Sequence, residues 1–259
     1  LKMLVYMKTP SNFRKIPDDI IKTMISVDTI KIFNFSLQEQ IDLLTFFNHK
    51  MLINIDVEVM PDEQDLIARW EDLIMKCQNL ESLTVRLGGY WRGRSDLWSM
   101  TGSGIQDPQQ EEEEDYVPED ERKDFHFPAL KKFALISSTG GDWEKANKFL
   151  LMVKECTELE TLWIDLSAFT IGRFKRIENI LKKNPSIKDL KMDHANRDSF
   201  GLKPSVASFK MVPIPSNLVQ LKLPEWVFKA PKELFREVFS NLTQIKRLEF
   251  GMKGPNYAS

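Results

Sequence analysis

The sequence predicts an α/β solenoid, in which short strands form a curved parallel sheet on the inside and helices lie on the outside. Three observations predict it: an apolar phrase that recurs along the chain, a nearly constant spacing between its copies, and a helical pattern between most neighbouring copies. One such unit cannot bury its own apolar face, so the units must stack. We therefore expect about nine irregular repeats of about 28 residues, forming a single domain over residues 1–259.

The recurring phrase is an apolar residue, two others, an apolar residue, one other and a third apolar residue. Its clearest copies begin at Leu80, Leu130, Leu159, Ile187, Leu218 and Ile245, and weaker copies begin at Leu1, Val27 and Leu52. The middle apolar residue falls at positions 4, 30, 55, 83, 133, 162, 190, 221 and 248, so every step is 25 to 31 residues except one of 50. Alternate side chains of a strand face opposite ways. We therefore expect the apolar positions to enter the core.

Helical periodicity separates most of these copies. Apolar residues recur at intervals of three or four in the segments 36–48, 62–77, 142–156, 168–183 and 231–241. Ser36 is a good N-cap residue, and Pro231 suits the start of a helix. The segment 203–215 holds three prolines, so we expect no regular helix there.

The 50-residue step contains an insert, residues 88–127. Its first part is aromatic and basic and is expected to contact a partner or to pack on the edge of the array; the residues are Tyr90, Trp91, Arg92, Arg94 and Trp98. Its second part, residues 107–124, has ten acidic residues against Arg122 and Lys123. Like charges at this density repel and stay solvated, which predicts disorder. A sharper hypothesis is that this segment masks the basic region 170–259, where 17 Lys and Arg residues stand against 8 Asp and Glu residues.

Composition excludes several classes of protein. A net charge of −2 argues against a dedicated nucleic-acid-binding protein, although the basic region 170–259 keeps nucleic-acid association as a third alternative. No apolar run approaches the roughly 20 residues that span a bilayer, so we expect no membrane partner. The chain begins with Leu1 and not with Met, which suggests a fragment or a processed form.

The residues that could carry chemistry fit structural roles better. Cys77 and Cys156 both lie three residues before the first apolar residue of a repeat, and Asn184 fills the same position, so we expect buried structural thiols. Unpaired thiols suit a reducing, intracellular compartment, either cytoplasmic or nuclear. His49, His126 and His194 fall at unrelated repeat positions and make no metal signature. We therefore expect no catalytic residue, no metal and no cofactor, and do not expect an enzyme.

The strand–helix unit resembles a leucine-rich repeat. The segments 74–87, 152–167 and 180–193 are most similar to the irregular repeats of fungal F-box/leucine-rich-repeat proteins. In that family the array recognises the substrate of a ubiquitin-ligase adaptor, and the resemblance implies the same role here. It also implies a Skp1-like adaptor as a partner, reached through a domain absent from this chain. Residues 16–21 come nearest to the opening of an F-box, but we interpret them as a helix start.

The residues between the apolar positions are expected to line the concave face of the sheet and to bind a protein partner. The expected contacts are Thr84, Arg86, Ala134, Ile136, Trp163, Asp165, Lys191, Asp193 and Lys222, with Asn54, Asp56 and Glu249 on the same face. Trp163 is expected to point away from the core. An exposed tryptophan there is typical of a binding hot spot, unless a neighbouring loop covers it.

Two functional hypotheses follow. The first is a protein-interaction module, in its most specific form the substrate-recognition array of an F-box-type adaptor. The alternative is a structural scaffold subunit of a larger assembly, which docks through its edges and its insert.

Overall fold

The computed structural model describes a large part of the chain, with gaps. The described residues are 3–7, 27–33, 35–59, 64–87, 127–137, 149–150, 152–153, 156–165, 171–193, 214–224, 232, 236, 239–240 and 242–251.

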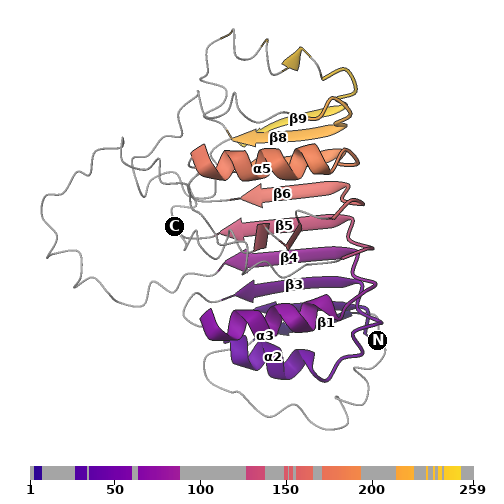
Figure 1. The fold of residues 1–259 in the computed structure, drawn as a ribbon, viewed down its shortest axis with the longest axis vertical. Coiled ribbons are helices and arrows are strands. Elements are labelled where there is room, and N and C mark those ends of the chain that lie inside the picture. The colour runs from indigo at the N-terminus through magenta and orange to yellow at the C-terminus, as the bar shows by residue number, and fades with distance from the viewer. Residues whose placement is uncertain are drawn as a thin grey trace, which may run out of the picture.

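In the described part of the chain, nine strands form one sheet, and the order of the strands follows the order of the chain (Figure 1). Every neighbouring pair is parallel. The strands are β1 (Met3–Met7), β2 (Thr29–Phe33), β3 (Asn54–Val59), β4 (Ser82–Leu87), β5 (Lys132–Ser137), β6 (Thr161–Asp165), β7 (Asp189–Asp193), β8 (Gln220–Pro224) and β9 (Arg247–Gly251). The predicted α/β class and the parallel sheet are confirmed.

Helices connect the strands and lie in front of the sheet in the view of Figure 1. The helices whose bounds lie within the described residues are α2 (Leu37–Leu44), α3 (Gln64–Met75) and α5 (Ile171–Lys183). Ser36 caps α2 as predicted: its side chain accepts from the Glu39 backbone N–H, and the Glu39 side chain accepts from the Ser36 N–H. This reciprocal pair satisfies two donors that the start of a helix leaves free.

The predicted register is confirmed, because the middle apolar positions of all nine copies lie in one continuous ladder. From Ile30 to Leu221 these residues are at most 1% exposed. Leu248 is 42% exposed, so its expected place in the core was wrong. The reason is that, among the described residues, β9 has a neighbouring strand on one side alone.

From β2 onward, each described unit is joined to the next by the same pair of backbone hydrogen bonds. The carbonyl just after the first apolar residue of a copy accepts two successive N–H groups of the following unit, at 2.7–3.1 Å. The accepting residues are Asp28, Ile53, Glu81, Lys131, Glu160, Lys188 and Val219. Because the same bonds recur at every one of these junctions, each strand begins at an equivalent point and the apolar rows stay aligned.

The insert does not interrupt the stack of units. Strands β4 and β5 pair directly over six positions, although residues 88–131 separate them in the chain. In the helical layer, Trp70 of α3 packs edge-on against Phe149, with ring centroids 5.7 Å apart. At the turns, Lys131 Nζ lies 3.2 Å from Glu81 Oε1. The 50-residue step therefore corresponds to one step of the sheet.

Equivalent side chains close the last turn of three helical segments. Cys77 Sγ donates to the Leu73 carbonyl at 3.6 Å, and Cys156 Sγ donates to the Met152 carbonyl at 3.7 Å. Asn184 Nδ2 donates to the Ile180 carbonyl at 2.8 Å. The final carbonyls of a helix have no partner within it. The Leu73 and Ile180 carbonyls also accept a backbone N–H just beyond the helix, from Lys76 at 3.2 Å and from Asn184 at 3.0 Å. The buried thiol or amide is therefore a further donor to the end of the helix, at the same place in each repeat.

The contrast between buried and exposed positions of one ladder gives a stability prediction. Leu83→Ala should lower the free energy of unfolding by about 3 kcal/mol, because a fully buried leucine leaves a cavity. Leu248→Ala should cost less than about 1 kcal/mol, because that side chain is exposed. Guanidinium denaturation followed by circular dichroism measures both. Equal losses would contradict the assigned register.

His49 provides a pH-dependent prediction. Burial lowers its pKa below the ordinary value of 6.5, and the nearby Lys76 charge lowers it further, while a hydrogen bond with the Leu44 backbone acts in the opposite direction. The unfolded chain therefore takes up a proton more readily than the folded chain. Stability should fall as the pH drops from 7.5 through 6.5, and His49→Gln should reduce that dependence. Urea unfolding at several pH values measures the free energy of unfolding of both proteins. The same dependence of that free energy on pH in both would refute the prediction.

Candidate functional site

The residues that alternate with the core positions lie in three parallel rows on the other face of the sheet, which we call the non-core face. The central row runs through Lys31, Asp56, Thr84, Ala134, Trp163, Lys191, Lys222 and Glu249. A second row joins Arg86, Ile136, Asp165 and Asp193. A third row includes Thr29, Asn54, Ser82, Lys132, Thr161, Asp189, Gln220 and Arg247. The nine expected contact residues thus all fall in the first two rows.

Arg86 is held in place by two neighbours. Its Nε donates to Asp56 Oδ1 at 2.8 Å and its Nη2 to Asp56 Oδ2 at 3.1 Å. Its guanidinium carbon lies 5.6 Å from the centre of the Phe33 ring, which suits a cation–π contact. The hydrogen bond with Asp56 is the largest cause that raises the pKa of Arg86. The guanidinium is therefore fixed before any partner arrives.

Sequence reasoning placed Arg86 and Asp56 on this face but missed their pairing and missed Phe33. In register, Arg86 stands opposite Glu58, so the ion pair with Asp56 runs diagonally between strands. Phe33 could have been found, because it alternates with the core residue Ile32 in β2.

The centre of the non-core face is less exposed than expected. Trp163 is half-buried, and its indole Nε1 reaches neither solvent nor a hydrogen-bond acceptor among the described residues. Ala134 is 8% exposed, so it offers a partner little surface, and its role as a contact stays a prediction. A single methyl group between Thr84 and the much larger Trp163 leaves little surface for a partner to touch.

Next to Trp163 lies a pair of charged residues, Lys191 and Asp189, of which the sequence analysis named only Lys191. Lys191 stands opposite Trp163, and its Nζ lies 3.1 Å from Asp189 Oδ2 on the same strand. Asp189 was not among the expected contacts, although its position two residues before Lys191 places it on the same face. Its second oxygen, Oδ1, is buried without a hydrogen-bond partner among the described residues.

Some expected contacts lie outside the described residues. These are Tyr90, Trp91, Arg92, Arg94 and Trp98, together with the acidic segment 107–124. For Asp165 and Asp193 the strand positions are described, and both lie in the second row.

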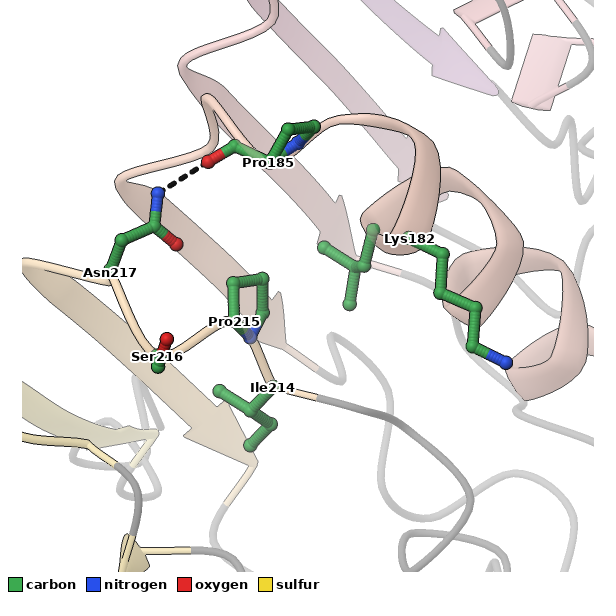
Figure 2. A pocket seen from close by; sticks show the side chains of 7 residues that line it. Lys182, Pro185, Ile214, Pro215, Ser216 and Asn217 are labelled. Atoms are coloured by element: carbon green, nitrogen blue, oxygen red, sulfur yellow. Dashed lines mark hydrogen bonds between the residues drawn. The ribbon is translucent and has the colours of Figure 1, made fainter.

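A pocket of about 250 Å³ lies near the end of α5, away from the expected contacts (Figure 2). Its lining is Leu181, Lys182, Pro185, Ile214, Pro215, Ser216 and Asn217. Asn217 Nδ2 donates to the Pro185 carbonyl across it, which joins two successive turns. Lys182 is paired with Glu178. Ligand pockets usually measure at least about 300 Å³ and combine several polar groups, so this one fits a seam between units better.

Within the described ranges, no three or more His, Cys, Asp and Glu side chains gather in a way that could hold a metal ion. None of the helices described is long and apolar enough to cross a membrane. Cys77 and Cys156 are both free and buried, and burial raises the pKa of the Cys77 thiol to about 12.

Neither the models of known protein families nor the curated protein sequences include a match to this chain.

The buried thiols lead to a chemical prediction. In the native protein, Cys77 and Cys156 should resist Ellman's reagent at pH 8, because the thiolate is the reactive form and Cys77 holds its proton far above that pH. Both thiols should react at once in denaturant. Rapid stoichiometric labelling of the native chain would show that these residues are accessible and would contradict a purely structural role.

Proposed function

We propose that this chain is a leucine-rich-repeat solenoid that presents the non-core face of its sheet to a protein partner. The observation that carries the proposal is the set of three side-chain rows, held in register from strand to strand across the sheet. Parallel strands lie about 4.8 Å apart, so these rows offer contacts at fixed intervals over a long surface.

The repeat type is supported by the recurrence of the same features at equivalent positions. All nine copies share the apolar phrase, seven described junctions share the paired backbone bonds, and three units have a donor that closes the preceding helical turn. Among ordinary α/β sheets, nothing requires strands to follow the chain order through nine positions. Stacked repeats require it, because each unit packs on the one before it.

Two residues support recognition of a protein. Arginine and tryptophan are enriched among the residues that dominate binding energy. Arg86 is already fixed by Asp56 and Phe33, so little side-chain freedom is lost when a partner binds. Ile136, which stands beside Arg86 in the second row and is partly exposed, adds apolar surface between Arg86 and the strand of Trp163.

The narrower proposal is that the array recognises the substrate of an F-box-type ubiquitin-ligase adaptor. It rests on the resemblance of the segments 74–87, 152–167 and 180–193 to the repeats of that family. A Skp1-like partner would then bind through a domain outside this chain.

The second candidate is a scaffold subunit that docks through an edge of the sheet. The observation that favours it is the exposure of Leu248 on β9, at a position that is buried in every neighbouring unit from β2 to β8. The half-buried state of Trp163 is compatible with it as well.

Affinity capture with matched variants distinguishes the two candidates. Ile136→Asp places a charge on the non-core face, and Asn179→Asp places the same charge on the exposed surface of α5. We expect Ile136→Asp to reduce recovery of a specific partner at least tenfold, an effect of about 1.4 kcal/mol, while Asn179→Asp leaves recovery unchanged. Circular dichroism should verify equal folding.

The control for the scaffold candidate is Leu248→Asp. If this variant loses the partner and Ile136→Asp keeps it, the partner binds at the edge and the interaction proposal for the non-core face is wrong.

A further inference from the structure

Two polar atoms near the middle of the non-core face have no hydrogen-bond partner among the described residues and no contact with solvent. One is a donor, Trp163 Nε1–H, and the other is an acceptor, Asp189 Oδ1. Nearly all buried polar groups in folded proteins are paired. Two unpaired groups of opposite kind on one face therefore require an explanation.

The register brings these two residues close together. Thr161 stands opposite Asp189, and Trp163 stands opposite Lys191, so Trp163 and Asp189 are diagonal neighbours on adjacent strands. Strands lie about 4.8 Å apart and rise about 3.3 Å per residue, so diagonal neighbours two residues out of step lie about 8 Å apart at their backbones. Long and aromatic side chains can span that distance. Trp163 and Asp189 also point to the same face, since each alternates with a buried core residue.

Lys191 pairs with one of the two carboxylate oxygens of Asp189. Its Nζ lies 3.1 Å from Asp189 Oδ2, and the Asp189 side chain is 20% exposed. The carboxylate is thus anchored through one oxygen, while the other, Oδ1, remains available as an acceptor. Trp163 can only donate, because an indole N–H accepts nothing.

The chemistry of the cluster selects one kind of ligand. An anionic group would suit the indole N–H but would meet the Asp189 carboxylate, and a cationic group would meet Lys191 and leave the indole donor unfilled. The main chain of an extended segment carries both kinds of group, and the N–H and C=O of one residue point to the same side of the segment. One residue can therefore satisfy both unpaired atoms at once and adds no charge.

We propose that Trp163 and Asp189 bind the main-chain N–H and C=O of one residue in an extended segment of the protein partner. The segment's carbonyl accepts from Trp163 Nε1–H, and its N–H donates to Asp189 Oδ1. Since neither atom meets solvent in the free chain, binding includes a rotation of the partly exposed Trp163 side chain. The inference rests on the proposed function and names the chemistry that the same face recognises.

Peptides selected from a displayed library of random 12-residue sequences test the inference. Several unrelated peptides that bind the wild-type chain are measured by calorimetry against Trp163→Phe, which removes the N–H and keeps an aromatic ring, and Asp189→Asn, which removes the charged acceptor. Asn179→Asp on α5 is the control. We expect each of the two site variants to weaken every peptide about tenfold, whatever its sequence, because a main-chain amide is common to all of them.

A scan of single N-methylated amides along one peptide completes the test. One N-methyl position should weaken binding to the wild-type chain, and Asp189→Asn should add no further loss for that peptide. Such a shared loss identifies the pair of groups that contact each other.

The outcomes separate this inference from the function that it rests on. If Trp163→Ala abolishes binding while Trp163→Phe and Asp189→Asn do not, the non-core face binds peptides but the amide contact is wrong. If no peptide is enriched on the wild-type chain, or if losses vary with peptide sequence, the inference is overturned. The proposed function is tested separately, by the affinity capture that compares Ile136→Asp with Asn179→Asp.

Discussion

The rest of the structure depends on one pair of hydrogen bonds that recurs at the junctions between units. A backbone carbonyl just after the first apolar residue accepts two N–H groups of the next unit, from Asp28 to Val219. These bonds fix where each strand begins. A shift of one residue would move every apolar side chain of a strand to the opposite face. The constant starting point therefore aligns both the apolar rows of the core and the rows of the non-core face.

This alignment connects folding to recognition. Residues far apart in the chain become neighbours at fixed intervals, so Arg86 can reach Asp56 diagonally and Trp163 can lie beside Lys191 and Asp189. Each strand of the sheet pairs with its neighbours, and Arg86 is held by two hydrogen bonds to Asp56. At Arg86 a partner would therefore meet a side chain that is already in place, which reduces the entropy lost on binding.

The repeat pattern was sufficient to predict the strands, their order and their register, because period and spacing depend on local sequence. It also predicted that Cys77, Cys156 and Asn184 occupy equivalent positions, where each donates to a helical carbonyl. The pattern could not predict the diagonal pair of Arg86 and Asp56, because side chains choose among several neighbours on a sheet. The pattern also could not predict how exposed each side chain is. Ala134 is buried because it is small and stands beside Trp163. Leu248 is exposed because the stacking of described units stops at β9.

Site-specific photo-crosslinking in cells tests the central claim that the non-core face contacts a protein partner. A benzophenone amino acid replaces Thr84 in the central row of that face, and in a second protein it replaces Asn179 on α5. The account predicts a discrete crosslinked species of higher mass from position 84 and none from position 179. Crosslinks from position 179 alone would place the partner on the helical layer and contradict the account.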